Sequence, residues 1–155
     1  MYKKLFFISI GLWIVLLLIL GKYFILGSTH NSTDGRRYIE LSAAEKDFVL
    51  LEMRGLLTSV NGILIGLDAN DKKKMIESAR SAGMSGHSNV EAGHKSIMLK
   101  LPMEFKKMGM GLHKDFDNLA EIIESGATDK EIVKKLANIS GQCIQCHSGF
   151  RFSAE

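Results

Sequence analysis

The stretch from Thr128 to His147, TDKEIVKKLANISGQCIQCH, contains a helix start, an apolar stripe and a closely spaced pair of cysteines. Its first four residues form a capping box, in which the threonine hydroxyl and the glutamate carboxylate each accept a hydrogen bond from the other residue's backbone amide. Ile132, Leu136 and Ile139 then follow at helical spacing. We therefore expect one amphipathic helix here, whose apolar stripe needs other helices to pack against.

Three further helices are expected upstream of this stretch. Ser42-Ala43-Ala44-Glu45 is a second capping box and opens a helix that runs to about Leu67. A shorter helix is expected over residues 71–82, and Pro102, the only proline, suits the first turn of another. No strand-like alternation is visible. Four amphipathic helices with mostly short joints predict an all-α domain, an antiparallel four-helix bundle over residues 41–155.

The N-terminal segment predicts a transmembrane or signal helix. Residues 5–26 are apolar apart from Lys22, and about 20 such residues span a bilayer. Because no Ala-x-Ala site follows, residues 1–27 are interpreted as an uncleaved anchor that contacts membrane lipid through residues 5–26. The positive charges before the apolar run place the rest of the chain on the periplasmic face of a bacterial inner membrane. A cleaved signal, which would leave a soluble periplasmic domain, is the alternative.

The net charge of the chain belongs to its start. The 155 residues carry a net charge of +3, and Lys3, Lys4 and Lys22 account for it, because residues from Ser28 onward hold 17 basic and 17 acidic side chains. A nucleic-acid-binding surface needs a basic excess, so no nucleic-acid partner is expected. Residues 28–40 are polar and rich in Gly, Ser, Thr and Asn, which predicts a polar tether between the anchor and the domain.

The five residues Cys143-Ile144-Gln145-Cys146-His147 form the attachment signature of haem c. Two thiols about one helical turn apart can bond the two vinyl groups along one edge of a porphyrin, and the histidine can then ligate the iron. We expect one covalent haem c on Cys143 and Cys146, with His147 as the proximal ligand. A redox-active dithiol, a structural disulfide, and a zinc site completed by a remote histidine are the alternatives.

A helical bundle with this motif on its last helix resembles the cytochrome c prime family of class II c-type cytochromes. Phe150 and Arg151 resemble the aromatic and basic residues that follow the proximal histidine in that family, which implies that Arg151 lies near the proximal face of His147. Arg54 resembles a first-helix arginine that reaches a haem propionate. The family's distal residue lies four positions later, as Met in low-spin members and as a bulky apolar residue in five-coordinate members. Here that position is Thr58, which departs from both.

The sixth iron ligand is not assigned by the sequence. A row of small residues on the first helix, Gly55, Thr58 or Ser59, Gly62 and Gly66, favours close approach of a flat macrocycle, with close helix packing as the alternative. The candidates that could ligate the iron are Met53, Met98, Met103, Met108, Met110, His30, His87, His94 and His113.

These features favour a monohaem c-type cytochrome that transfers electrons between redox partner proteins in the periplasm. The alternative is a five-coordinate haem protein that binds small gases such as nitric oxide or carbon monoxide. No distal acid–base constellation is visible, so an enzyme is not expected. Exposed helix faces of such bundles often pair, which makes a homodimer an open expectation.

Overall fold

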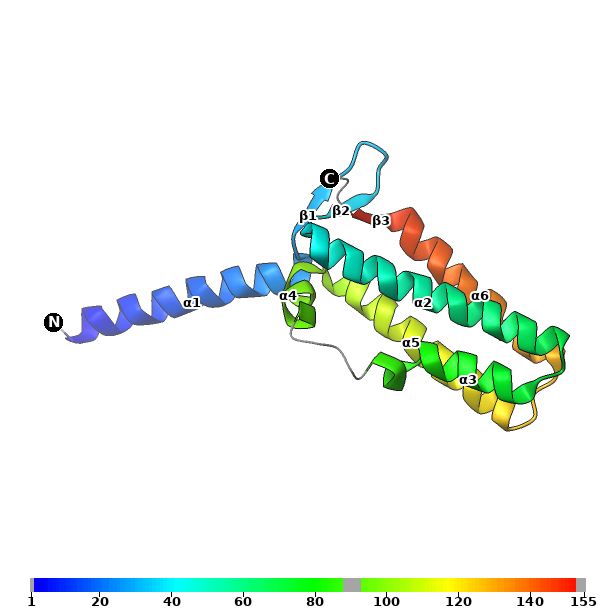
Figure 1. The fold of residues 1–155 in the computed structure, drawn as a ribbon. Coiled ribbons are helices and arrows are strands. Elements are labelled where there is room, and N and C mark those ends of the chain that lie inside the picture. The colour runs from blue at the N-terminus through cyan, green and yellow to red at the C-terminus, as the bar shows by residue number, and fades with distance from the viewer. Residues whose placement is uncertain (1, 88–92, 153–155) are drawn as a thin grey trace.

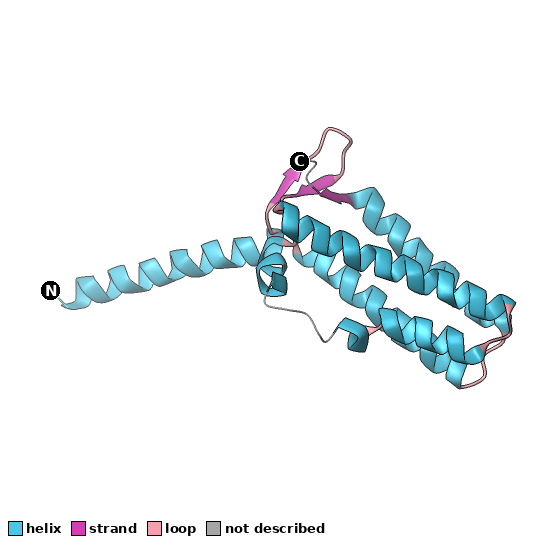
Figure 2. Ribbon diagram, in the orientation of Figure 1, coloured by secondary structure: helices cyan, strands magenta, loops and turns pink. Residues whose placement is uncertain are grey.

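The computed structural model describes residues 2–87 and 93–152, which are mostly helical with one small sheet at one end of the helices (Figures 1 and 2). The helices are α1 (Tyr2–Leu26), α2 (Ala43–Asp68), α3 (Lys72–Ala82), the 3-10 helix η1 (Met84–His87), α4 (Gly93–Lys100), α5 (Met103–Glu124) and α6 (Asp129–Gly149). The strands are β1 (Thr29–Asn31), β2 (Arg37–Ile39) and β3 (Phe150–Phe152).

The helix starts follow the capping signals in the sequence. At α2 the Ser42 amide donates to Glu45 Oε2 at 2.8 Å and the Glu45 amide donates to Ser42 Oγ at 3.4 Å. Thr128 and Glu131 make the same reciprocal pair at the start of α6. Asp71 caps α3 through the Lys74 amide. Both expected capping boxes are therefore confirmed.

The long helices share one apolar core. α2 packs on α3, α3 on α5 and α5 on α6, and successive members run in opposite directions (Figure 1). Along the described residues α2 and α6 do not pack closely on each other. The first core cluster is drawn from all four helices and consists of Ile63, Met75, Ala79, Ala82, Leu112, Phe116, Leu119, Ala120, Ile123, Ile132, Leu136 and Ile139.

The row of small residues on α2 serves helix packing. A Cβ at Gly62 would collide with the Ser78 side chain of α3, and one at Gly66 would collide with Met75. Ser59 is buried, and its Oγ lies 3.0 Å from Ser81 Oγ. These residues face α3 rather than the cysteine-bearing helix α6. The expectation that these residues allow close approach of a flat macrocycle is therefore wrong for Ser59, Gly62 and Gly66, because α3 fills that space.

A small sheet departs from the all-α expectation. The expected tether, residues 28–40, contains the antiparallel hairpin β1–β2, and β2 pairs in parallel with β3 in the register Arg37 with Phe150 and Ile39 with Phe152. Ile39 is fully buried, which pulls this otherwise polar segment onto the domain. The sequence shows no strand alternation here because each strand is three residues long and its partner β3 is more than a hundred residues away.

A second core cluster lies beneath the sheet. Its buried members are Ile39, Leu41, Val49, Ile97, Leu101 and Phe150, and the partly buried side chains packed on them are Phe48, Met53, Phe105, Met108, Cys146 and Phe152. Ile97 and Leu101 come from α4 and the residue after it, so this short helix contributes to the cluster.

Helix α1 extends away from the rest of the molecule (Figure 1). It has 25 residues, none of them buried, and is long and apolar enough to be a membrane anchor or a signal. α2 passes the same test of length and composition, although part of its surface is buried in the core. The N-terminal helix therefore has the character expected of it from the sequence.

Candidate functional site

The cysteine pair lies in the last turns of α6. Cys143 and Cys146 are one helical turn apart on a helix that continues to Gly149, and both side chains are partly buried. The Cys143 thiol donates to the Ile139 carbonyl at 3.7 Å. Both cysteines are free thiols, so the structure does not pair them in a disulfide.

The surroundings of these thiols keep them protonated. Burial raises the pKa of the Cys146 thiol to about 11, and the neighbouring Cys143 adds to the rise. Burial also raises the pKa of Cys143. Because a redox-active dithiol depends on a lowered thiol pKa, this environment does not favour the dithiol alternative.

A cavity of about 180 Å³ opens beside Cys146 and His147. Most of its lining is apolar, and two arginines are its only charged side chains among the described residues. The lining residues are Arg36, Leu50, Met53, Phe105, Cys146, His147, Phe150, Arg151 and Phe152. They come from the hairpin, from α2, from the start of α5, and from the end of α6 with β3. The ring of Phe105 packs edge-on against those of Phe150 and Phe152, at centroid distances of 5.4 and 5.8 Å.

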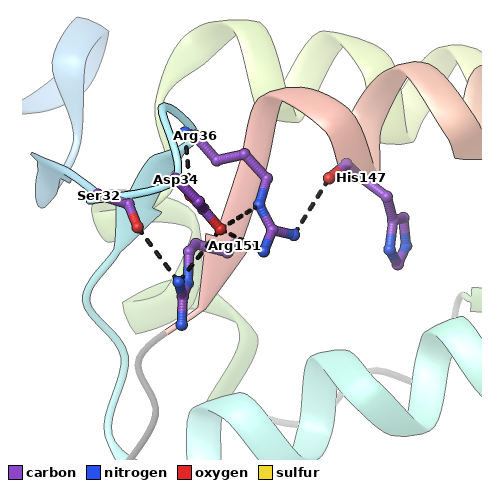
Figure 3. Close-up of polar contacts among 5 residues, drawn as sticks. All are labelled: Ser32, Asp34, Arg36, His147 and Arg151. Carbon is purple, nitrogen blue, oxygen red and sulfur yellow. Dashed lines mark hydrogen bonds and ion pairs between the residues drawn. The ribbon is translucent and has the colours of Figure 1, made fainter.

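The two cavity arginines are joined by one carboxylate (Figure 3). Arg36 donates from Nε and Nη2 to Asp34 Oδ2, at 2.9 and 2.6 Å. Arg151 Nη1 donates to the same oxygen and to Ser32 Oγ, each at 3.2 Å. Arg36 Nη1 also donates to the backbone carbonyl of His147 at 3.3 Å. The hairpin is thereby tied to the end of α6 at the histidine itself.

This cluster leaves a positive charge beside the cavity. The Arg36 side chain and backbone bind Asp34 and hold the pKa of its carboxyl well below its usual range, so Asp34 is ionised at neutral pH. Two guanidinium groups then share one carboxylate. Within residues 2–87 and 93–152 no second acid pairs with either arginine, so the cluster has a net charge of +1.

The imidazole of His147 is exposed and is directed away from Arg36 and Arg151 (Figure 3). In the described part of the chain no hydrogen bond holds its ring, although its carbonyl is bound by Arg36. A ring nitrogen of His147 is therefore available to a ligand at the edge of the cavity.

The structure brings only some of the expected site residues together. Cys146, His147 and Arg151 line one cavity, and Cys143 lies one turn earlier on the same helix. Arg151 is bound to Asp34 and Ser32, in addition to lying near the end of α6. Arg54 and Thr58 are exposed on α2 outside the cavity lining.

Thr58 and Arg54 are joined to each other through the backbone. The Thr58 hydroxyl donates to the Arg54 carbonyl at 2.9 Å, so its proton is used within α2. Arg54 follows directly after Met53, which does line the cavity. The propionate role that the family resemblance implies for Arg54 stays a prediction.

The candidate sixth ligands differ in whether their side chains line the cavity. Met53 is the one that lines the cavity among the described residues. His113 Nδ1 lies 2.7 Å from the Ala82 carbonyl in the core, and His30 Nε2 lies 3.4 Å from Glu40 Oε2 on the surface. The side chains of His87 and His94 lie outside the described residues. The remaining methionines, Met98, Met103, Met108 and Met110, do not line the cavity.

Sequence reasoning missed the hairpin as a part of the site. Arg36 lies in a polar stretch that carried only the signal of a tether, and no local pattern indicates that it reaches α6. Leu50 on α2, Phe105 on α5 and Phe152 in β3 are recognisable from the sequence only as apolar side chains. That apolar character is shared by core residues, so it did not identify a cavity.

The lining and the volume of the cavity can be compared with what a haem on this motif would need. Its apolar walls, free imidazole and cationic rim match the needs of a porphyrin with an iron and two carboxylates. Its volume is below the roughly 300–1,000 Å³ of usual ligand sites. The cavity would have to widen between α2 and α6, which do not pack closely on each other along the described residues. The chemistry of the lining therefore suits a haem, whereas the volume does not, and the cavity would need to extend toward Cys143 to admit one.

The zinc alternative gains no support. Among residues 2–87 and 93–152, no group of three or more His, Cys, Asp or Glu side chains is arranged to hold a metal ion.

Comparisons with known proteins leave the site to be judged by its own chemistry. A scan against models of protein families, a search of curated proteins and a search of solved structures each found no match.

Proposed function

We propose that this chain is a monohaem c-type cytochrome that carries electrons on the periplasmic face of the inner membrane, with α1 as its anchor. Cys143 and Cys146 would hold one haem c through thioether bonds, and His147 would be its proximal ligand. The haem domain would be an antiparallel four-helix bundle of α2, α3, α5 and α6, similar to the cytochrome c prime family. One observation carries the proposal: the attachment motif meets an apolar cavity with a cationic rim at Cys146 and His147.

Each wall of the cavity has a defined part in this proposal. Phe105, Phe150 and Phe152 exclude water from one side, which strengthens electrostatic interactions inside the site. Arg36 and Arg151 supply the positive charge that propionate carboxylates need as they leave bulk water. Asp34 holds both guanidinium groups in place.

Met53 favours the electron-carrier assignment over gas binding. When bound, haem c supplies a one-electron iron couple, and a methionine ligand raises its potential. Met53 reaches the cavity from α2, whereas His147 reaches it from α6. Among the candidates whose side chains the structure describes, the Met53 thioether would therefore be the one to supply a second iron ligand. If Met53 stays off the iron, the neighbouring Leu50 leaves an apolar distal side that is suited to nitric oxide or carbon monoxide.

The attachment itself is tested by expressing the full chain with a c-type haem maturation system. We expect a covalent haem that survives denaturing electrophoresis, and its complete loss in the Cys143→Ser, Cys146→Ser variant. Ser148→Ala, next to His147 on the same helix, is the matched control and should keep the haem. A wild-type chain without covalent haem would refute the proposal, as would covalent haem in the double variant.

The choice between electron carrier and gas-binding protein is tested by visible spectra. The carrier assignment predicts a low-spin reduced spectrum with a sharp α band that carbon monoxide leaves unchanged. Met53→Leu should convert this spectrum to a high-spin, gas-responsive one, while Met110→Leu, which changes an exposed methionine outside the cavity, should not. A wild-type spectrum that already shifts with carbon monoxide would favour gas binding.

A further inference from the structure

The junction between α1 and the domain is packed rather than loose. Gly27 follows α1 with φ of +63°, and a Cβ there would collide with the backbone of Lys100, Leu101 and Pro102. The Ser28 amide donates to the Lys100 carbonyl at 2.8 Å, and the Ser28 carbonyl accepts from the Glu40 amide at 2.9 Å. The chain therefore leaves α1 pressed against the segment that joins α4 to α5, and residues 28–40 fold back onto it.

A buried lysine binds the end of α1. Lys106 on α5 is only 6% exposed, and its Nζ donates to the Phe24 carbonyl at 3.3 Å. The same ammonium lies 4.5 Å from the centroid of the Phe24 ring. The last carbonyls of a helix lack intrahelical partners and carry partial negative charge, so a cation is stabilising there. Burial lowers the pKa of Lys106.

The docked end of α1 lies beside the cavity. Phe105 lines the cavity, and Lys106, the next residue of α5, binds α1. The sheet, the start of α2 and the end of α6 all gather at the end of the domain where α1 arrives (Figure 1). The opposite end lies farther away, because α2 has 26 residues and is about 39 Å long.

We propose that α1 and the helical domain form one rigid unit, which holds the cavity at the surface of the bilayer and within reach of a membrane-embedded redox partner. The inference rests on the proposed function for the role of α1 as an anchor and for the redox role of the cavity. A flexible linker of 13 residues would have a root-mean-square end-to-end distance of about 20 Å, so the domain could move by that much relative to α1. The contacts of Gly27, Ser28 and Lys106 remove this freedom. The cavity end then always faces the membrane, and α2 and α6 extend away from it.

The test measures the distance of each end of the domain from lipid headgroups. Nitroxide labels are placed on Asn31→Cys at the cavity end or Lys130→Cys at the far end, both exposed positions. The background is the full-length Cys143→Ser, Cys146→Ser chain, so each label is unique and no haem is needed. In phosphatidylcholine vesicles with gadolinium chelated to a fraction of the headgroups, we expect relaxation enhancement several-fold larger at Asn31→Cys than at Lys130→Cys.

Removing the joint provides the decisive comparison. Lys106→Met keeps most of the buried side-chain volume and removes the bond to Phe24, and it should reduce the difference between the two labels at least twofold. Lys107→Met alters the exposed neighbouring lysine and should leave the difference unchanged. Equal enhancement at both labels in the parent chain would overturn the inference, and so would an unchanged difference in Lys106→Met. Because these measurements need no haem, they can fail while covalent haem attachment succeeds, and the reverse also holds.

Discussion

The helical domain has two unlike halves. The half that lies far from α1 has a filled core between α2, α3, α5 and α6, whereas the half that contacts α1 surrounds a cavity. The far core is aliphatic apart from Phe116 and the methionine of α3, and Gly62 and Gly66 let α2 approach α3 closely. The near half contains three phenylalanines, Cys146 and Met53 around an opening of about 180 Å³. It also contains the arginine pair held by Asp34.

This difference separates the scaffold of the protein from its site. In the far half, the local signals of capping, spacing and apolar burial all favour the same structure, as in a region selected for stability. In the near half, two arginines held by Asp34 and two partly buried thiols lie beside apolar side chains, a mixture that a packed core does not need. The comparison predicts that substitutions in the two halves have different consequences.

The largest expected effect is in the far core. Phe116 is 1% exposed, so Phe116→Ala should lower the free energy of unfolding by about 3–5 kcal/mol through lost burial and the cavity left behind. Phe105→Ala should cost less, because Phe105 is only partly buried and already borders an opening, and in the proposed haem-bound form it should also change the visible spectrum. Urea unfolding in detergent micelles, followed by circular dichroism, measures both losses. Equal losses in the two variants would contradict the division into scaffold and site.

A smaller loss of stability is expected when acid protonates Glu45, in the half of the domain near α1. Burial alone would raise the pKa of Glu45, but hydrogen bonds from Lys100 at 2.6 Å and from Ser42 outweigh it and lower the pKa to about 2. A carboxyl whose folded pKa is depressed stabilises the protein above its unfolded pKa, and this contribution is lost as the pH falls through the folded value. The loss should therefore occur between about pH 4.5 and pH 2 and amount to roughly 3 kcal/mol.

This pH effect is checked by unfolding the chain at a series of pH values. Glu45→Gln should lose most of the stabilisation at pH 7 and should flatten the dependence on pH below 4.5. Glu121→Gln on α5, an exposed glutamate, is the control and should keep the wild-type slope. A Glu45→Gln variant with unchanged acid sensitivity would show that Glu45 does not link α4 to α2 in solution.

The smallest effect compares the two capping boxes. Thr128→Ala removes the cap of α6 and should cost about 1 kcal/mol, the usual value for a lost N-cap. Each cap hydroxyl also donates to its own glutamate, at 2.9 Å from Ser42 to Glu45 and at 2.8 Å from Thr128 to Glu131. Ser42→Ala should cost more, because Glu45 in turn binds Lys100 of α4. Thermal unfolding of the two variants gives the ranking, and a larger loss for Thr128→Ala would reverse the expected order.

The starts of α2, α3 and α6 were predictable to within about a residue, because capping residues and apolar spacing are local signals. Ser42, Asp71 and Thr128 each cap the helix that the sequence indicated. The sequence indicated the cavity residues Cys146, His147 and Arg151 at and just after the end of α6, and it named Met53 on α2 only as one of several candidate ligands. Arg36 could not be predicted, since its contact with the His147 carbonyl joins residues 111 positions apart.

The use of the small residues on α2 could not be predicted either. Glycine at helical spacing allows close approach of any flat or narrow neighbour, whether a macrocycle or another helix. The structure places Ser78 and Met75 of α3 against Gly62 and Gly66, so these two glycines serve packing. The sequence alone leaves both possibilities open, because the spacing of the glycines does not show whether a macrocycle or another helix packs against them.

The sequence by itself determined the apolar N-terminal helix, the capped helices of the domain and the Cys143–His147 motif, because hydrophobic periodicity, caps and motif spacing act over a few residues. Only the tertiary structure decided that residues 28–40 form a hairpin, that Asp34 joins Arg36 to Arg151, and that Lys106 binds the end of α1. Those contacts depend on strand pairing, burial and charge across distant parts of the chain. They form, and stabilise the protein, only after the helices have packed.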